Sequence, residues 1–328
     1  MYSEAARRMA AQLALKPGRP NVEVFAETLL ELARKDRQLL AITSDSRGSG
    51  KLGPFGQALP DQIIEVGIAE QNLVGIAAGL AASGKRVFAV SPACFLTARA
   101  LEQIKNDVAY SDHPVKLVGI SAGVSYGALG STHHSLHDIA ALRAINNIDI
   151  VVPADNQETR CAVEAAARAR HPTYLRFGKA PLYDLHPPGL SYERGKAIVL
   201  REGADLAFIA SGETVVHAVL AAGELAASDG ISCSVISMPM IRPLDTDAVV
   251  NAARSGAVIT VEEHMINGGL GEACASVLLE SGKAVRFKRV GIPDEYTVTG
   301  SQSDIFRHYG ISMEGLAAAG RQLLREGR

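Results

Sequence analysis

The stretch that decides the fold is Glu65-Val66-Gly67-Ile68-Ala69-Glu70-Gln71-Asn72-Leu73, in which a short apolar run gives way to a glycine-bearing apolar helix. We predict a strand over 62–66 and a helix that begins at about Glu70. Open α/β sheets bind ligands beyond the carboxyl ends of their strands, so this loop is expected to lie at a ligand site. The helix dipole favours the charged form of a carboxylate in the first turn, whereas burial disfavours it. Glu70 is therefore the leading candidate for a functional carboxylate, and its partner would decide its charge.

Strands and helices alternate on both sides of this stretch. Helical spacing of apolar residues predicts helices over 22–35, 70–83, 95–110, 136–145 and 156–170. Apolar runs predict strands over 39–42, 86–90, 115–120, 149–152 and 173–177. The loop over 43–60 holds four glycines and two prolines, and we expect no regular structure in it. The alternation predicts a parallel sheet with helices on both faces.

The same alternation restarts after residue 195. Strands are expected over 206–210, 232–236, 256–261 and 285–290, and helices over 214–227, 271–279 and 313–324, with a further helix after Pro243. The segment 186–194 contains proline and glycine without apolar periodicity, which is typical of a linker. The sequence therefore predicts two doubly wound α/β domains, over 19–185 and, smaller, over 195–328. An N-terminal extension over 1–18 is expected to form a helix that begins near Ser3.

Composition excludes several classes of function. The chain has 328 residues, 47% of them hydrophobic, and a formal net charge of -2, so neither nucleic acid nor an anionic membrane is an expected partner. Its four cysteines are widely spaced and form no C-x-x-C pair, so no disulfide framework or structural zinc is implied. No apolar run reaches the roughly 18 residues of a membrane span. We predict a cytoplasmic protein.

The loop Gly48-Ser49-Gly50-Lys51-Leu52-Gly53 matches the G-x-G-x-x-G pattern of dinucleotide-binding proteins. In those proteins the glycines open a helix whose N-terminus holds a pyrophosphate, but here Pro54 and Gly56 follow at once. Leu52 after Lys51 also departs from the Walker phosphate-binding pattern. A surface loop is the stronger interpretation, and dinucleotide binding is the weaker alternative.

The run His133-His134-Ser135-Leu136-His137 places three imidazoles within five residues. Zinc would require further soft ligands and groups that orient the histidines, and the run lacks the glutamate of H-E-x-x-H sites. The glycine-rich loop before it favours His133 at the mouth of a cleft, where imidazole suits hydrogen bonding and proton transfer near neutral pH. A histidine cluster without function is the alternative.

Phe95 lies where the predicted strand over 86–90 gives way to a helix. Packing in the core is the ordinary role of a phenylalanine at such a place. A stacking platform for an aromatic ligand is the alternative.

Taken together, these residues resemble the transketolase family. The first half is similar to its pyrimidine-binding domain through Ile68-Ala69-Glu70-Gln71-Asn72, Phe95, Gly130-Ser131-Thr132-His133 and Pro153-Ala154-Asp155. The second half is similar to its C-terminal domain through Thr260-Val261-Glu262-Glu263-His264, Gly268-Gly269-Leu270-Gly271 and Gly300-Ser301. Related domains occur in 1-deoxyxylulose-5-phosphate synthase and in the β subunits of 2-oxoacid dehydrogenases. The resemblance spans roughly 19–325 and implies thiamine diphosphate as cofactor.

The resemblance gives each candidate residue a role. Glu70 matches the carboxyl group that bonds N1′ of the cofactor's pyrimidine and activates the cofactor, and Phe95 matches the ring that stacks on that pyrimidine. Ile68 and Gln71 flank Glu70 and are expected to contact the cofactor. His133 matches the histidine that faces the substrate's oxygens during ketol cleavage and transfer. The positions that match the lining of the substrate channel are Arg19, Asp45, Ser49 and Lys179.

The resemblance also implies a partner chain. Full-length transketolases carry an N-terminal domain whose G-D-G…N motif holds Mg²⁺ and the diphosphate, and this sequence contains no such motif. We therefore expect one subunit of a split transketolase, whose partner chain binds Mg²⁺ and the diphosphate. An α2β2 heterotetramer with active sites at the interface between the chains would follow.

Three positions depart from the family's pattern. Leu129 replaces the usual acid, Ser121 replaces a common histidine, and Lys179 replaces an arginine that grips phosphate with two parallel bonds. The substrate therefore stays open between a sugar phosphate, a sugar with another anionic group and an unusual acceptor. The predicted function is transfer of a two-carbon ketol unit from a ketose to an aldose. The alternatives are a subunit of a 1-deoxyxylulose-5-phosphate synthase-like or 2-oxoacid dehydrogenase-like enzyme, or a non-catalytic assembly subunit.

Overall fold

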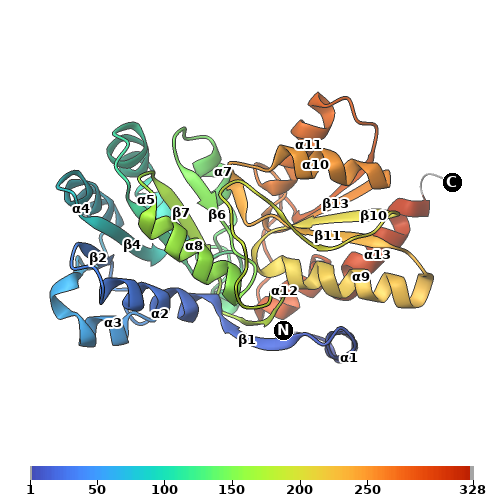
Figure 1. Ribbon diagram of the computed structural model, residues 1–328, viewed down its shortest axis with the longest axis horizontal. Coiled ribbons are helices and arrows are strands. Elements are labelled where there is room, and N and C mark those ends of the chain that lie inside the picture. Colours follow the sequence, from blue (N-terminus) through green and yellow to red (C-terminus); the bar gives the residue numbers. More distant parts are fainter. Residues whose placement is uncertain (1, 326–328) are drawn as a thin grey trace.

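Two largely parallel β-sheets lie side by side in the computed structural model, which describes residues 2–325 (Figure 1). The strands of the first sheet, in the order in which they pair, are β12 (Met240–Arg242), β6 (Asp149–Val151), β7 (Thr173–Phe177), β5 (Lys116–Ile120), β4 (Arg86–Pro92), β2 (Leu39–Thr43) and β3 (Ile63–Glu65). All of them pair in parallel except β12, which is antiparallel to β6. This sheet positions the candidate site.

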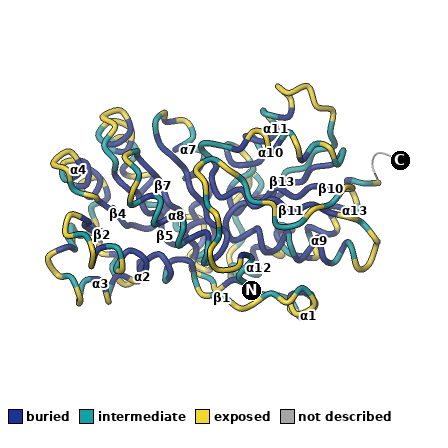
Figure 2. Tube along the Cα trace, viewed as in Figure 1, coloured by how far each residue is buried: buried dark blue, intermediate teal, exposed yellow. Residues whose placement is uncertain are grey.

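Helices cover both faces of the first sheet. One face packs against α2 (Asn21–Ala33), α3 (Gly53–Ala58) and α8 (Asn156–Arg168), and the other against α4 (Glu70–Ala82), α5 (Ala93–Arg99) and α7 (Asp138–Arg143). Figure 2 shows the strands as the most deeply buried part of this half. Three rings, Phe25, Phe88 and Phe177, meet under α2 and are almost fully buried. Burial of such a ring contributes about 1.5–3 kcal/mol to folding.

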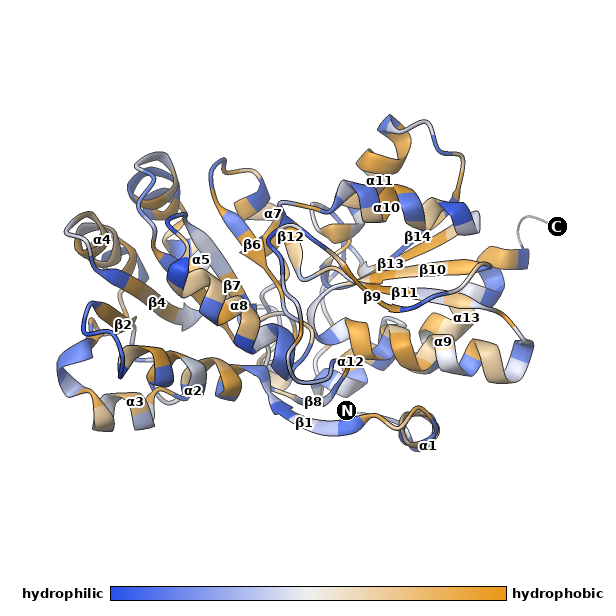
Figure 3. Cartoon of the chain, in the orientation of Figure 1, coloured by the Kyte–Doolittle hydropathy of each residue, from blue (hydrophilic) through white to orange (hydrophobic). Residues whose placement is uncertain are grey.

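The second sheet is also largely parallel and covered by helices on both faces, but it has fewer strands. In pairing order it contains β14 (Arg286–Ile292), β13 (Ala257–Met265), β10 (Leu206–Ala210), β11 (Cys233–Ser237) and the antiparallel edge strand β9 (Ile198–Arg201). One face packs against α9 (Val215–Asp229), α12 (Gln302–His308) and α13 (Met313–Arg325), and the other against α10 (Thr246–Ala252) and α11 (Leu270–Glu280). Figure 3 shows the apolar character of its central strands. The predicted fold class, two α/β units with parallel sheets, is confirmed.

The two halves interlock. Strand β12 comes from the C-terminal half but extends the first sheet, and one apolar core runs through both halves. Helix α1 (Glu4–Gln12) begins after Ser3, whose hydroxyl accepts the backbone N–H of Ala6, and it packs against α9. Strands β1 (Lys16–Pro20) and β8 (Pro181–Asp184) pair antiparallel where the chain passes between the halves. The first sheet is therefore held in place by segments from both ends of the chain.

The structure differs from the sequence predictions at several places. The loop over 43–60 contains α3, because Pro54 lies in the first helical turn, where its missing N–H costs nothing, and Phe55 is buried. The segment 95–110 is not one helix, since α5 ends at Arg99 and is followed by α6 (Leu101–Gln103) and the wider, π-type helix η2 (Ile104–Tyr110). The short strands β1, β8, β9 and β12 were not predicted. They have three to five residues, and β1 consists only of lysine, arginine, proline and glycine, so local sequence gives no clear strand signal for them.

Single turns of 3₁₀ helix complete the fold. They are η1 (Pro60–Gln62), η3 (Gly127–Leu129), η4 (Gly212–Thr214) and η5 (Ala253–Ser255). Within residues 2–325, no helix is both long enough and apolar enough to cross a bilayer.

Candidate active site

The candidate residues come from loops and helix starts that follow the parallel strands of the first sheet. Strands β2, β3, β4, β5 and β7 are followed, in this order, by Asp45 and Ser49, Glu70, Phe95, His133 and Lys179. Carboxyl ends of parallel strands meet at one edge of a sheet, and that edge is where such sheets bind ligands. Side chains from segments far apart in the sequence are thus gathered on one side of the sheet.

Glu70 lies in the first turn of α4 and is almost completely buried, with 3% of its side chain exposed. Both of its carboxylate oxygens accept hydrogen bonds from Nη1 of Arg99, at 3.0 Å each. The Arg99 side chain is 50% exposed. A buried carboxylate needs a partner for its charge, and here solvent reaches that partner.

Glu65, at the end of β3, plays a different part. One of its oxygens accepts the backbone N–H groups of Asp45 at 2.7 Å and Gly67 at 3.0 Å, and the other accepts the hydroxyl of Thr43. Burial raises the pKa of Glu65, but these hydrogen bonds outweigh burial and lower that pKa below its ordinary value. Glu65 therefore holds the loops after β2 and β3 together and leaves Glu70 as the carboxylate available to a ligand.

The Arg99 guanidinium lies over the first of several aromatic rings that contact one another. Its Cζ lies 4.4 Å from the centroid of the Phe95 ring. The His133 ring meets both Phe95 and Tyr126 edge to face, with 5.3 Å between centroids in each case. Nδ1 of His133 lies 2.9 Å from the hydroxyl of Thr132. The structure thus brings Glu70, Phe95 and His133 into one continuous group, with Arg99 and Tyr126 between and beside them.

A hollow of about 520 Å³ opens beside this group. It is lined by Ile68, Ala69, Glu70, Gln71, Asn72 and Arg99. Ile68 is 73% exposed. Both residues predicted to flank the cofactor, Ile68 and Gln71, therefore line the same hollow as Glu70.

Two lysines approach the group from other loops. Nζ of Lys179 lies 4.5 Å from the centroid of the Tyr126 ring. Burial lowers the pKa of Lys179, and the charge of Lys51 lowers it further. Burial also raises the pKa of Tyr126, although the neighbouring side chains of Ser121 and Ser49 oppose that rise. The charges of the two lysines are therefore near enough to influence each other.

The loop that carries Ser49 and Lys51 is strained. Asp45 and Lys51 in this loop, and Ser121 in the loop after β5, adopt φ angles of 53°, 59° and 54°, which residues other than glycine rarely take. They make up half of the six non-glycine residues with positive φ in the described part of the chain. Such conformations gather at functional sites. The glycine pattern over 48–53 belongs to this loop, and the six-residue α3 that follows is shorter than a dinucleotide-binding helix.

Arg19 does not join this group. Its guanidinium makes two hydrogen bonds of 2.6 Å with the carboxylate of Glu27, and its backbone N–H bonds Asn156. Glu23, one turn earlier on α2, is the residue that reaches the site's edge, through an ion pair of 3.2 Å with Lys51. The sequence match placed a cation at Arg19, whereas the cations near the other site residues are Arg99, Lys179 and Lys51.

The three histidines of the run over 133–137 have different partners. His134 is buried and bonds the carbonyl of Gly127 at 2.9 Å, and His137 approaches the hydroxyl of Thr97 at 3.5 Å. Only His133 contacts Phe95 and Tyr126. Among residues 2–325, no group of three or more His, Cys, Asp or Glu side chains is arranged to hold a metal ion.

A second polar cluster lies between the two halves. Nε2 of Gln302 donates to Glu213 and to Glu263, at 2.8 Å each. A Cβ on Gly178 would come within 1.8 Å of the Glu213 carboxylate, and one on Gly123 within 2.2 Å of the Glu263 carboxyl carbon. Burial, and then repulsion between the two acids, raises the pKa of Glu213; burial also raises that of Glu263. The carboxyl groups of Glu213 and Glu263, from the C-terminal half, thus pack closely against the backbone of the first half.

Arg176 on β7 anchors this junction. Its Nε donates to Asp138 at 2.8 Å, and Nη2 donates to the carbonyls of Ser135 at 3.1 Å and Glu263 at 2.8 Å. The hydroxyl of Tyr174 donates to the same Asp138 oxygen at 2.7 Å. Burial raises the pKa of Asp138, but the Arg176 charge, the neighbouring His264 and the hydrogen bonds from Arg176 and Tyr174 together outweigh burial, so that this pKa lies below its ordinary value.

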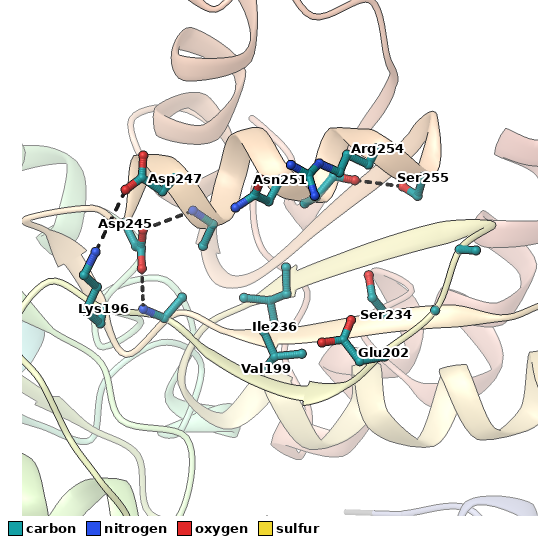
Figure 4. A pocket seen from close by; sticks show the side chains of 15 residues that line it. Lys196, Val199, Glu202, Ser234, Ile236, Asp245, Asp247, Asn251, Arg254 and Ser255 are labelled. Atoms are coloured by element: carbon teal, nitrogen blue, oxygen red, sulfur yellow. Dashed lines mark hydrogen bonds and ion pairs between the residues drawn. The ribbon is translucent and has the colours of Figure 1, made fainter.

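A groove of about 590 Å³ lies elsewhere, between β9 and α10 of the second sheet (Figure 4). Asp245 there accepts the backbone N–H groups of Ala197 and Ala248, at 3.0 Å each. Lys196 is within 4.0 Å of Asp247. Several of its polar groups already have partners within the chain, and none of the predicted site residues lines it.

Sequence reasoning missed Arg99, Lys51 and Tyr126. Arg99 follows Phe95 by four residues in the same helix, a spacing that places two side chains on one helix face. That spacing would have identified Arg99 once Phe95 was selected. Lys51 and Tyr126 reach the site through loop conformations that no local pattern specifies.

Comparison with known proteins identifies the family to which this chain is similar. The model of the transketolase pyrimidine-binding domain matches residues 20–183, and that of the transketolase C-terminal domain matches residues 195–316. An apulose-4-phosphate transketolase subunit of Phocaeicola vulgatus is 47% identical over 304 residues, which cover 92% of this chain and 96% of that protein. A 6-deoxy-6-sulfo-D-fructose transketolase subunit of a Clostridium species is 33% identical, over 92% of this chain and 93% of that protein.

Among solved structures, a protein described as a split gene transketolase, inactive beta4 tetramer, superposes with a TM-score of 0.85. It is 34% identical, and the superposition covers 95% of this chain and 100% of that one. These relatives with the same span are thus named as subunits or as a split-gene product.

Proposed function

This chain belongs to the transketolase family, and we propose that it is the subunit of a split transketolase that binds the pyrimidine end of thiamine diphosphate. With a partner chain, the enzyme transfers a two-carbon ketol unit from a ketose to an aldose. The observation that carries the proposal is the buried Glu70 carboxylate in the first turn of α4, which shares Arg99 with the Phe95 ring and lines an open hollow. We also propose the division into 19–185 and 195–328, joined by 186–194.

The residues present fit the pyrimidine of the cofactor. A buried carboxylate whose side-chain partner is half exposed can exchange that partner for a ring nitrogen. The Phe95 ring, already covered by a planar guanidinium, offers a face for a planar ring. Ile68 and Gln71 line the same hollow and would enclose the ring. Thiamine diphosphate, when bound, supplies the carbanion chemistry that ketol transfer requires.

Glu70 and His133 divide the proton handling between them. Glu70 would share a proton with the pyrimidine nitrogen in a site that the partner chain closes to water, where a carboxylate's charge is strongly felt. His133 uses Nδ1 for Thr132, which leaves Nε2 for an oxygen of the substrate. Asp45 and Ser49, on the strained loop after β2, would meet the substrate's hydroxyl groups.

The diphosphate end would be held by the partner chain together with Mg²⁺, in an α2β2 assembly. The naming of the relatives as subunits supports this division. The similar solved structure, described as an inactive tetramer of β chains, also supports it.

We propose a sugar with an anionic group as the substrate. Lys179, which lies over the Tyr126 ring, and Lys51, whose charge acts on Lys179, would pair with that group. One relative is named for apulose 4-phosphate and another for a sulfonated fructose, so both a phosphate and a sulfonate are candidates. Apulose 4-phosphate is the first donor to test, because the more similar of these two relatives is named for it.

The test is co-purification with a chain that carries a G-D-G…N motif, followed by a screen of ketose donors and aldose acceptors. We expect ketol transfer only from the mixture, and weak binding of thiamine diphosphate by this chain alone. Ketol transfer by the purified chain without a partner would contradict the proposal. Consumption of pyruvate, without transfer from any ketose, would assign the chain to an enzyme of the 1-deoxyxylulose-5-phosphate synthase or 2-oxoacid dehydrogenase type.

A further inference from the structure

Arg99 is the residue of the site to which the proposed function gives no role. It ends α5, and its guanidinium lies over Phe95, 4.4 Å from the ring centroid. The same guanidinium donates to both oxygens of Glu70 at 3.0 Å. Within residues 2–325, Arg99 is the only hydrogen-bond partner of the Glu70 carboxylate. One side chain thus engages both Glu70 and Phe95.

This ion pair differs from the ordinary surface pairs of the chain. In the Arg19–Glu27 pair, 52% and 51% of the two side chains are exposed. In the Arg99–Glu70 pair the arginine is 50% exposed and the carboxylate only 3%. An exposed arginine can leave for solvent with little loss, because water replaces its contacts. The buried carboxylate cannot, since it would become an unpaired buried charge.

A guanidinium and an aminopyrimidine have the same recognition chemistry. Both are planar groups that stack on an aromatic face, and a guanidinium N–H and a protonated ring nitrogen can each donate to a carboxylate. The Phe95 face and the Glu70 carboxylate are the two surfaces that the proposed function assigns to the cofactor's pyrimidine. Both groups cannot occupy them at once.

We propose that Arg99 occupies the pyrimidine position and that thiamine diphosphate must displace it to bind. Arg99 compensates the buried charge of Glu70 until the cofactor arrives, and it weakens cofactor binding by competing for the same contacts. This inference rests on the proposed function. It adds a residue of this chain that sets the affinity for the cofactor without being needed to hold it.

The test is a titration of thiamine diphosphate into the complex of this chain with its partner, followed by calorimetry. Loss of the contacts that the half-exposed Arg99 makes with Glu70 and with the Phe95 ring should tighten binding by about tenfold in Arg99→Gln. Arg99→Lys keeps the charge but loses the planar contact, and its affinity should fall between the two. Arg160→Gln is the matched control, because Arg160 forms a half-exposed pair with Glu31 on another helix and should bind like the unchanged chain.

A second variant separates competition from a structural effect. In a Glu70→Ala background, Arg99→Gln should no longer tighten binding, because the contested carboxylate is gone. If Arg99→Gln leaves the affinity unchanged or weakens it, Arg99 is not a competitor and the inference is overturned. If the unchanged complex binds no thiamine diphosphate at all, the proposed function itself fails.

Discussion

The Arg99–Glu70 pair and the Arg176–Asp138 pair both lie near the carboxyl edge of the first sheet, but solvent reaches only one of them. Arg99 is 50% exposed over a carboxylate that is 3% exposed, whereas Arg176 and Asp138 are 5% and 0% exposed. Arg99 has Glu70 and the Phe95 face as its contacts, while Arg176 also bonds two backbone carbonyls.

This difference in exposure distinguishes an ion pair that can give way to a ligand from an ion pair that stabilises the fold. Charges that are fully enclosed and hydrogen-bonded hold two parts of a fold in one arrangement, and they cannot be exchanged for a ligand without exposing the core. A buried carboxylate with one exposed partner can change partners. The first kind of pair joins the halves of the chain, and the second kind marks the place where the proposed cofactor binds.

The largest expected effect follows from breaking the enclosed pair. Arg176→Leu leaves Asp138 as an uncompensated buried charge, which should lower the free energy of unfolding by about 3–5 kcal/mol. Chemical denaturation measures this change. Arg99→Leu is the matched control, and equal losses in the two variants would remove the distinction between the pairs.

The next largest expected effect is on turnover and follows from removing the Glu70 carboxylate. Glu70→Ala in the reconstituted enzyme should lose on the order of 10²-fold or more in turnover, because the group that shares a proton with the pyrimidine is gone. Its unfolding free energy should change less than that of Arg176→Leu. A normal turnover number would show that another residue performs this task.

The polar junction should also make stability depend on pH. The pKa of Glu213 and that of Glu263 are raised, mainly by burial, above those of the unfolded chain. The stability that these acids contribute is therefore fully present at low pH and is lost as the pH rises through the raised values. From about pH 4.5 to about pH 8, between the ordinary pKa of a glutamate and the raised values of about 8 for Glu213 and about 7 for Glu263, the unfolding free energy of the unchanged chain should fall more steeply than that of the Glu213→Gln/Glu263→Gln variant. Parallel curves would contradict this assignment.

The smallest expected effect is the change in the free energy of unfolding when the Arg99–Glu70 pair is broken at its exposed arginine. Arg99→Gln should lower the free energy of unfolding by only about 1 kcal/mol, because Arg99 itself is half exposed and the glutamine amide can still donate a hydrogen bond to the buried Glu70 carboxylate. The same denaturation experiment tests it. A loss comparable to that of Arg176→Leu would make Arg99 a structural residue.

Local sequence patterns predicted the strands and helices around Glu70 well. The apolar run over 39–42 and the helix that begins at Glu70 both appear in the structure, since their periodicity is strong and their ends carry clear signals. The predicted group of Glu70, Phe95 and His133 follows from the parallel sheet, which brings strand ends to one edge.

Other parts of the site depend on contacts that no local pattern contains. Arg19 turns to Glu27, and Lys51 reaches the site through a left-handed backbone conformation. Strand β12 joins a sheet built from the other half of the chain. Tertiary packing determines these conformations and pairings, because local interactions alone leave the alternatives close in energy.

Exchange of the proton at the thiazolium carbon of thiamine diphosphate tests the central claim most directly. The exchange into deuterated water would be followed by NMR in this chain alone, in the chain with its partner, and in the partnered Glu70→Ala variant. We predict fast exchange only in the unchanged partnered complex, and a rate on the order of 10²-fold lower in the variant. Equal exchange rates in the variant and the unchanged complex would contradict the assignment of Glu70.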